Sequence, residues 1–342
     1  MDQGKIGDCD YCSHKKVYVY DISKTPNPIS DAIIGLVQTY SVSDFPGAKP
    51  LKMAINDDWD IFSPGSAMVQ TLLVDLCGSV ISPDSDILTR KVVISQLLDH
   101  DFLREFGVVR GFSWEQFAES IKHENRFHSG MFNVDTFASF LSIISKPYSA
   151  GSTFYRARIS QSSLGYQLHD MGAPPREKRS AGLINPEGIG VLYLSSSKET
   201  ALNEVRATTF DFVSVGTFES DRDIKVVNLS GISGTSPFLY QGELERYAAN
   251  RKVFQDISFE IAKPLRRSER QIEYLPTQYI SEFIKSQGYD GVEYASTLHA
   301  GGYNIAIFDE KQFRCANVET VEINKIIYSF KSVLNALYDQ YS

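Results

Sequence analysis

The sequence predicts an α+β protein with a helical N-terminal domain, followed by a domain of short strands, few helices and long loops. Three observations support this prediction. The 342 residues exceed the usual size of a single domain. Apolar residues recur with helical spacing before residue 146 and alternate as in strands after residue 153. A hydrophobic content of 42%, with 12% aromatic residues, is that of a globular protein with a sizeable core.

Net charge and the distribution of apolar residues argue against several classes of protein. A net charge of -8 argues against a polyanion-binding protein as a whole, although it is compatible with a local basic pocket for a phosphate. No apolar run has the length of a membrane span, and the polar N-terminus lacks the apolar region of a signal peptide, so we expect a cytoplasmic protein. The chain has four cysteines, and Cys77 and Cys315 lie far apart, which excludes a disulfide scaffold.

The first 25 residues are polar and contain a Cys-x-x-Cys pair. Cys9 and Cys12 have the spacing of half a zinc site, and His14 is a third candidate ligand, but no fourth is evident. Residues 16–20 then alternate like a strand. Two alternatives to zinc remain open, an unmetallated thiol pair and a knuckle completed from elsewhere in the fold.

Residues 26–146 have helical periodicity. We expect helices within residues 29–37, 68–76, 87–106, 114–126 and 134–144. Arg126 and His128 suggest a nuclease, since helical ribonucleases use Arg and His on one helix. Two residues apart, however, they point to different sides of a helix, and we reject that interpretation. A role in oligomerisation or sensing fits this domain better.

Residues 146–152 change composition and mark the domain boundary. Strands are expected afterwards at residues 153–159, 212–218, 225–229 and 304–308. A helix that includes residues 281–287 should end at Gly288. Long loops rich in glycine and proline connect these elements, so the domain should contain a cleft.

Residues 191–206 join a buried strand to a capped helix. Residues 191–194 are apolar and β-prone, and Ser196 with Glu199 has the pattern of a capping box, which places the helix start at Ser196. Alternation puts Leu192 and Leu194 on one strand face, and Tyr193 and Ser195 on the other. Glu204 then lies at the edge of the apolar helix face. It is a candidate site residue, although a surface acid paired with Arg206 is the common alternative.

Several segments, in this order, resemble the RES-domain family, which is named for its Arg, Glu and Ser. They are Phe154-Tyr155-Arg156-Ala157-Arg158, the stretch from Tyr193 to Glu204, and Gly291-Val292-Glu293-Tyr294-Ala295-Ser296. Further matches to longer members are Gly172-Ala173-Pro174-Pro175, Leu275-Pro276-Thr277-Gln278-Tyr279 and Gly301-Gly302-Tyr303-Asn304. Such members carry an N-terminal domain of the HEPN/RES type, sometimes after a Cys-x-x-Cys. We therefore expect an N-terminal segment at 1–25, a helical domain at 26–146 and a RES domain at 150–342.

The resemblance implies an ADP-ribosyltransferase-like fold with a mixed sheet, and an enzyme that consumes NAD+ as substrate without a further cofactor. Family members are described as NAD+ phosphorylases, with inorganic phosphate as co-substrate, or as glycohydrolases, and some relatives as ADP-ribosyltransferases. RES proteins are typically toxins of toxin–antitoxin pairs, so a helix-turn-helix antitoxin is the expected partner. We also expect a homo-oligomer, and no direct contact with membrane or nucleic acid.

The family's Arg, Tyr, Glu and Ser fall on Arg156, Tyr193, Glu204 and Ser296, and Asn304 is a further pocket residue. A carboxylate such as Glu204 can stabilise the oxocarbenium-like state in which the nicotinamide–ribose bond breaks. The Tyr193 ring can stack on nicotinamide. Ser296 can bond the nicotinamide amide or a ribose hydroxyl, and no His base marks it as a nucleophile. Singly, Tyr193 and Ser296 would be ordinary core and turn residues.

Cofactor-binding residues follow from the chemistry of NAD+. The guanidinium of Arg156, with Arg158 on the same strand face, suits a pyrophosphate. Gly301 and Gly302 allow close backbone approach to a ligand, or simply a tight loop. One departure from the family is Leu183, where we expect a second Arg in a Gly-Arg-x-Asn-Pro context. If that Arg binds phosphate in the family, its absence here favours hydrolysis over phosphorolysis, unless Arg176 or Arg179 replaces it.

The sequence therefore predicts an NAD+ phosphorylase or glycohydrolase that depletes NAD+. Transfer of ADP-ribose to a protein is an alternative, but it usually needs a second acid or amide near the catalytic Glu. Asn203 is adjacent to Glu204 and points elsewhere on a helix. A regulatory module with a degenerate NAD-binding pocket is another class, supported by Leu183 and opposed by the other motif residues.

Overall fold

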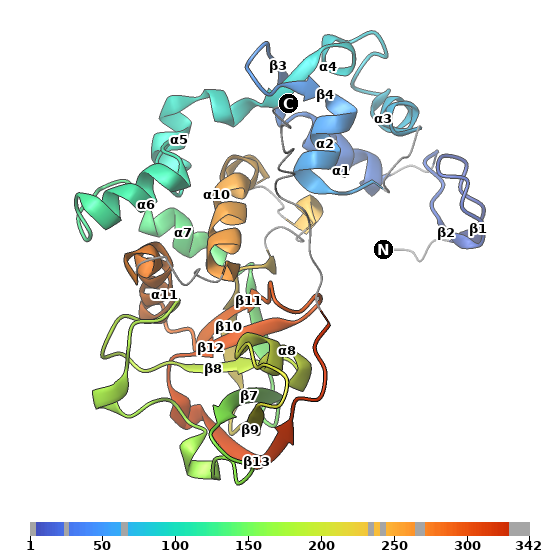
Figure 1. The fold of residues 1–342 in the computed structure, drawn as a ribbon. Helices are drawn as coiled ribbons and strands as arrows, with labels where there is room; N and C mark the ends of the chain where they lie inside the picture. The colour runs from blue at the N-terminus through green and yellow to red at the C-terminus, as the bar shows by residue number, and fades with distance from the viewer. Residues whose placement is uncertain are drawn as a thin grey trace, which may run out of the picture. The chain divides into compact units, whose positions relative to one another are not determined.

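The computed structural model describes residues 5–23, 27–62, 68–231, 236–239, 244–263 and 271–327, and of Arg176 and Leu239 only the backbone. The chain divides into two compact units (Figure 1). The first unit comprises Met1–Ser145 and Val227–Gln287, and the second Lys146–Val226 and Gly288–Ser342. Helices dominate the first unit and a large sheet the second, which confirms the α+β fold class.

Capping side chains begin several helices of the first unit. Asn27 accepts from the Ser30 backbone N–H, and Ser113 forms a capping box with Gln116. The helices are α1 (Pro28–Val37), α2 (Leu51–Trp59), α3 (Val69–Cys77), α4 (Asp86–Thr89), α5 (His100–Phe106), α6 (Trp114–His123), α7 (Val134–Leu141), α10 (Leu244–Ala262) and α11 (Leu275–Ser286). In the described part of the chain, none of the helices combines the length and apolarity that a bilayer crossing requires.

The helix expected at residues 87–106 is wrong. After α4 the chain forms strand β5 (Lys91–Ile94), which pairs with β3 (Tyr40–Val42) and β4 (Lys49–Pro50), before α5 begins. The reason is local, because Val92, Val93 and Ile94 are β-branched, and Val92 and Ile94 are buried.

An aromatic core holds α6, α7, α10 and α11 together within the first unit. Phe137 lies 5.7 Å from Phe254 and 5.3 Å from Phe132, between ring centroids. Tyr279 of α11 packs edge-on against Phe117 of α6 at 5.4 Å. Such ring pairs add to the stabilisation from their buried area. Residues far apart in sequence therefore share one core.

An eight-stranded sheet forms the frame of the second unit, in the order β13-β9-β7-β8-β12-β11-β10-β6. The pairings β13–β9, β9–β7, β7–β8, β8–β12 and β12–β11 are antiparallel. Its strands are β6 (Ser145–Tyr148), β7 (Thr153–Ser160), β8 (Leu192–Ser195), β9 (Phe212–Ser220), β10 (Ile224–Asn228), β11 (Gly291–Ala295), β12 (Tyr303–Ile307) and β13 (Phe313–Glu322).

The two faces of this sheet bury different groups of residues. Leu192, Leu194 and Ile305 belong to a large apolar cluster on one face. On the other face a smaller cluster includes Ala157 of β7 and Ala201 of helix α8 (Lys198–Glu204). Figure 1 shows α8 against the sheet. The alternation expected for residues 191–195 is confirmed, since Tyr193 and the two leucines lie on opposite faces.

Two long elements were not predicted. Helix α10 buries Asn250 and Arg251 together with its apolar residues, so it shows little of the apolar stripe that marks a helix in sequence. Asn250 is satisfied by bonds to the backbone of Phe106 and Val108. Strand β13 is largely polar, with a partly exposed pattern, and its pairing with β9 is a long-range contact.

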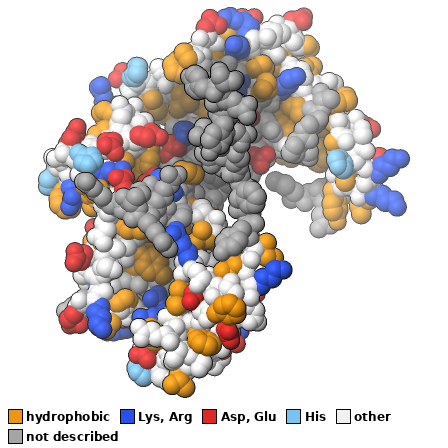
Figure 2. Space-filling view, viewed as in Figure 1, with side chains coloured by type: hydrophobic (Ala, Val, Ile, Leu, Met, Phe, Trp, Pro, Cys, Tyr) orange, Lys and Arg blue, Asp and Glu red, His pale blue; other side chains and the backbone are white. Residues whose placement is uncertain are grey.

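Charges of both signs mark the surface. On the face that Figure 2 shows, Lys and Arg side chains are interspersed with Asp and Glu and with apolar residues. Among the ion pairs, Arg314–Glu219 of β13 and β9 is largely exposed, with 63% and 32% of the side chains accessible. Pairs of this kind contribute little to stability, typically about 0–1 kcal/mol.

Helix α10 offers a matched pair for testing the aromatic core. Phe254 is 1% exposed and Phe259 is 69% exposed. We expect Phe254→Ala to lower the free energy of unfolding by about 3–5 kcal/mol, because it leaves a cavity among rings. Phe259→Ala should change it by less than about 0.5 kcal/mol. Urea unfolding followed by circular dichroism measures both, and equal losses would contradict this view of the core.

Candidate active site

A cavity opens where strands β7 and β8 part. The two strands share one Cα pairing, Tyr155 with Ser195, and continued pairing would have joined residues 156–157 to residues 193–194. These unpaired residues instead line a cavity of about 280 Å³. Its walls are Arg156, Ala157, Tyr193, Leu194, Ser195, Ala201, Glu204, Val205, Tyr294 and Asn304. The site therefore occupies a gap in the sheet.

Glu204 is held at the end of α8 by two hydrogen bonds to the same oxygen. The Ser296 hydroxyl and the Asn304 side-chain amide each donate to Glu204 Oε1, both at 2.7 Å. Among the described residues, Glu204 Oε2 makes no hydrogen bond. One oxygen thus fixes the carboxylate, and the other is available to a ligand.

Asn304 is itself oriented by a neighbouring strand. Ser195 donates from its hydroxyl to Asn304 Oδ1 at 2.7 Å, and the two residues are Cα partners in the β8–β12 pairing. With its oxygen occupied, the Asn304 amide presents its NH₂ group to Glu204. Sequence reasoning placed Ser195 on the Tyr193 face but did not include it in the site. The alternation of the strand was the only feature of the sequence that pointed to Ser195.

Ser296 begins a loop that closes on itself. Its hydroxyl accepts from the backbone N–H groups of Leu298 and His299, each at 3.2 Å, while it donates to Glu204. A Cβ on Gly302 would lie 2.5 Å from Thr200 Oγ1, so glycine is required by packing against α8. Gly301 has a φ of +77°, the left-handed region that glycine adopts readily. Neither glycine lines the cavity.

The start of α8 differs from the expectation by one residue. Ser197, rather than Ser196, is the N-cap, and its hydroxyl accepts from the Thr200 backbone N–H at 3.1 Å. The Ser196 hydroxyl accepts instead from the Tyr303 backbone N–H at 3.1 Å. The predicted capping box of Ser196 and Glu199 is therefore wrong, because the Ser196 hydroxyl is hydrogen-bonded to the backbone of β12.

Tyr193 is anchored by its hydroxyl, while its ring lines the cavity. The hydroxyl donates to Asn185 Oδ1 at 2.8 Å and accepts from the Ile184 backbone N–H at 3.1 Å. The Asn185 NH₂ group donates to the backbone carbonyls of Ser180, Pro186 and Ile189. The loop is thus built around Asn185, the Asn of the Asn-Pro pair that follows Leu183.

Arg156 places a half-buried positive charge on the cavity wall. Its Nη1 donates to the Tyr193 carbonyl at 3.1 Å, across the gap between the strands. Its Nε is buried and has no hydrogen-bond partner in the described part of the chain. Burial, and then the neighbouring charge of Arg158, lower the pKa of Arg156 to about 10. A bound anion would relieve both effects.

The other arginines considered for the site are engaged elsewhere. Arg158 donates to the Asp170 carbonyl and lies 4.6 Å from the Tyr166 ring centroid. Arg179 donates from Nε to the Pro174 carbonyl at 2.9 Å, and its Nη2 lies 3.9 Å from Glu310 Oε1. The Arg176 side chain lies outside the described residues. Neither Arg158 nor Arg179 lines the cavity.

Cys9 and Cys12 lie in the first unit, in the turn between β1 (Lys5–Gly7) and β2 (Val17–Val19). Both are free thiols. Hydrogen bonds from the backbone of Cys12 and then Tyr11 lower the pKa of Cys9. Across the described ranges, no three His, Cys, Asp or Glu side chains gather as a metal site. The zinc hypothesis therefore rests on the two thiols.

The structure thus gathers five of the predicted residues in one place. Four of them line the cavity and one contacts Glu204, namely Arg156, Tyr193, Glu204, Asn304 and Ser296. Arg158, Gly301 and Gly302 support the surrounding strands and loop.

Because Arg156 is a half-buried cation that forms no ion pair among the described residues, removing it should destabilise the protein little. We expect Arg156→Met to change the free energy of unfolding by less than about 1 kcal/mol, because removal of a guanidinium whose Nε is buried and unsatisfied among the described residues offsets the lost hydrogen bond to the Tyr193 carbonyl. Arg158→Met is the matched control and should lower it by about 1 kcal/mol, since it loses a carbonyl bond and a ring contact. Thermal and urea unfolding measure both. A loss above about 2 kcal/mol for Arg156→Met would show that this charge is structural.

The chain is similar to known proteins in its second half. The RES domain family model matches residues 153–329, just over half of the chain. No curated protein matches. A chain in the crystal structure of the M. tuberculosis MbcT–MbcA toxin–antitoxin complex is similar over 54% of this chain and 91% of its own, with 14% identity and a TM-score of 0.33. Likeness at that level does not establish a shared architecture. The match over residues 153–329 shows that this protein belongs to the RES domain family.

Proposed function

We propose that this protein is an NAD+-degrading enzyme that cleaves the nicotinamide–ribose bond. One observation carries the proposal. Glu204 lies on a cavity wall with one oxygen fixed by Ser296 and Asn304 and the other without a partner among the described residues. Membership of the RES domain family supports an enzymatic role on NAD+.

The chemistry needs a fixed negative charge beside the ribose. As the C–N bond breaks, its electron pair leaves with nicotinamide, and positive charge develops on the sugar. A preorganised carboxylate stabilises that charge without having to reorganise. Glu204 meets this need, because two donors hold it and its free oxygen can also accept from a ribose hydroxyl.

The remaining cavity residues suit the two ends of the substrate. The Tyr193 ring can stack on the cationic nicotinamide, and its anchored hydroxyl limits motion of the ring. The guanidinium of Arg156, whose Nε donor has no partner in the described part of the chain, suits the pyrophosphate. The positive and negative walls of the cavity thus match the charges of NAD+.

We propose water as the acceptor. Water forms the new bond to the ribose carbon, releases a proton, and yields ADP-ribose and nicotinamide. Leu183 is apolar where the family resemblance predicts an arginine, and Arg179 is engaged by Pro174 and Glu310. Transfer to a protein is the second candidate. Against it, the Asn203 side chain is bonded to the Glu199 carbonyl and is not presented to an acceptor.

A biological role follows from the family. Loss of NAD+ would make the protein a toxin, and an antitoxin protein is its proposed partner. The expected helix-turn-helix type of that partner, and a homo-oligomeric state, stay predictions.

Replacing Glu204 tests the catalytic assignment. Glu204→Gln keeps an oxygen for Ser296 and Asn304 but removes the charge, so NAD+ loss should fall by at least about 100-fold. Glu199→Gln, an exposed acid in the first turn of the same helix, is the matched control and should retain near wild-type activity. Chromatographic quantification of NAD+ and nicotinamide gives the rates. Comparable rates for both variants would remove Glu204 from the mechanism.

The acceptor can be identified from the products. We expect NAD+ loss to proceed in phosphate-free buffer and to give ADP-ribose, with no more than a small change when inorganic phosphate is added. Mass spectrometry distinguishes ADP-ribose from its phosphorylated form. A strict requirement for phosphate would make the protein a phosphorylase. Absence of NAD+ loss from folded, inhibitor-free protein would favour a binding module.

A further inference from the structure

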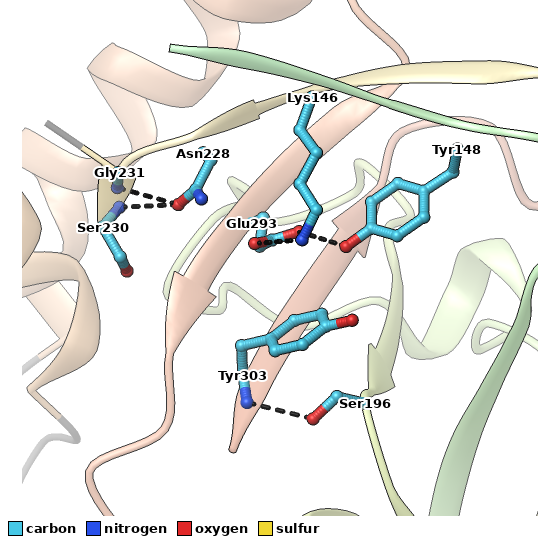
Figure 3. Close-up of polar contacts among 8 residues, drawn as sticks. All are labelled: Lys146, Tyr148, Ser196, Asn228, Ser230, Gly231, Glu293 and Tyr303. Carbon is cyan, nitrogen blue, oxygen red and sulfur yellow. Dashed lines mark hydrogen bonds and ion pairs between the residues drawn. The ribbon is translucent and has the colours of Figure 1, made fainter. Parts of the chain in front are cut away.

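A second polar cluster lies on the face of the sheet opposite the cavity. The Glu293 cluster consists of Lys146 and Tyr148 of β6, Glu293 of β11 and Tyr303 of β12 (Figure 3). Lys146 Nζ lies 3.0 and 3.1 Å from the two oxygens of Glu293. The Tyr148 hydroxyl donates to Glu293 Oε2. Both oxygens of this carboxylate are therefore held.

Two aromatic rings complete the cluster around the Lys146 ammonium. Its Nζ lies 4.8 Å from the ring centroid of Tyr148 and 4.7 Å from that of Tyr303. Ring faces attract a cation at such distances. Burial and the hydrogen bond to Glu293 raise the pKa of Tyr148, so its hydroxyl stays protonated as a donor. Lys146 and Tyr148 thus hold the Glu293 carboxylate, and the Tyr303 ring packs against the Lys146 ammonium.

The position of Glu293 is costly for a carboxylate. The residue is 4% exposed, and Tyr148 and Tyr303 pack against the large apolar cluster of the sheet. Burial of a carboxylate carries a large desolvation penalty, which its partners must offset. An aliphatic residue would fill a packing position at lower cost. The charge therefore has its clearest use in fixing geometry.

Strand alternation connects this cluster to the cavity. Tyr294 follows Glu293 and lines the cavity, and Asn304 follows Tyr303 and also lines it. Tyr294 pairs with Asn304, and Ala295 with Tyr303. A slip of one residue in β11 would exchange Glu293 and Tyr294 between the two faces. The side chains of the cluster and of the cavity wall thus depend on the same strand register.

A hydrogen bond connects Tyr303 of the cluster to the turn before α8, the helix that carries Glu204. The backbone N–H of Tyr303 donates to the Ser196 hydroxyl at 3.1 Å, as Figure 3 shows. Ser196 directly precedes Ser197, the N-cap of α8. Strand β12 is therefore tied to the turn from which α8 starts, while Asn304 of the same strand bonds Glu204 at the other end of that helix.

We propose that Glu293, held by Lys146 and Tyr148, is a positioning residue for the NAD+-cleaving site. It acts through β11 and β12 to keep Ser296 and Asn304 within hydrogen-bond distance of Glu204. This inference rests on the proposed function for its kinetic consequence. Its structural part, the control of the β11–β12 segment, can be measured without turnover.

The test compares Glu293→Gln and the milder Tyr148→Phe with Glu219→Gln, which breaks an exposed ion pair in the same sheet. We expect kcat for NAD+ cleavage to fall roughly tenfold in Glu293→Gln, and less in Tyr148→Phe, because small displacements of catalytic groups are costly. KM should stay within about twofold, and Glu219→Gln should match wild type. Assays run well below each melting temperature keep every variant folded.

A double-mutant cycle with Ser296→Ala separates positioning from general destabilisation. If Glu293 acts through the groups that hold Glu204, Glu293→Gln should cost much less in the Ser296→Ala background than in wild type. Independent, multiplicative losses would overturn the proposal. So would unchanged kcat in Glu293→Gln and Tyr148→Phe.

Hydrogen exchange separates failure of this proposal from failure of the proposed function. Lack of NAD+ loss by wild-type protein would count against the function alone. In that case the cluster is judged by amide exchange in Tyr148→Phe. Faster exchange confined to residues 292–307, with residues 213–220 unchanged, would support its control of β11 and β12. Unchanged exchange in both segments would overturn it.

Discussion

The site depends on the pair of hydrogen bonds that Ser296 and Asn304 donate to one oxygen of Glu204. A carboxylate at the end of a short helix would otherwise sample several rotamers and be solvated by water. Two donors at 2.7 Å remove that freedom and leave the second oxygen for a ligand. Each donor is itself held, Asn304 by Ser195 and Ser296 by two backbone N–H groups of its loop. The charge is thus oriented before any substrate arrives, which is the condition for electrostatic stabilisation of a transition state.

Space for a ligand arises where two neighbouring strands of the sheet stop pairing. Strands β7 and β8 share one register pair and then part, so that Arg156 and Tyr193 face a gap instead of a ladder. Arg156 bridges this gap by donating to the Tyr193 carbonyl, which satisfies one backbone group that the missing ladder leaves. The same separation leaves a guanidinium nitrogen buried and without a hydrogen-bond partner among the described residues, at a cost in stability. Such costs are typical of functional sites, where binding of the ligand offsets them.

Strands β11 and β12 contribute polar side chains to both faces of the sheet. On one face Tyr294 and Asn304 form the cavity wall, and on the other Glu293 and Tyr303 belong to a buried polar cluster. A polar cluster in an apolar face adds less stability than packing would, but it specifies one register, because the carboxylate has partners in only one position. The tight loop between these strands adds a second constraint, since Gly302 packs so closely against Thr200 that no side chain fits. Register and loop together determine where Ser296 and Asn304 lie.

The sequence by itself determined the fold class, the face alternation of residues 192–195, the strand at 153–159 and the order of the motifs. These depend on local periodicity and on neighbours along the chain. Only the tertiary structure decided which motif residues meet, because Glu204, Ser296 and Asn304 are joined by bonds spanning 92 and 100 residues. It also replaced the helix expected at 87–106 by β5 and its neighbours, and moved the cap of α8 to Ser197, because β12 claims Ser196. Helix α10 and strand β13 were not predicted. Buried polar residues interrupt the apolar stripe of α10, and β13 depends on long-range pairing with β9. The roles of Ser195, Asn185 and Glu293 are of the same kind, because each depends on a partner brought near by the sheet or by its loop.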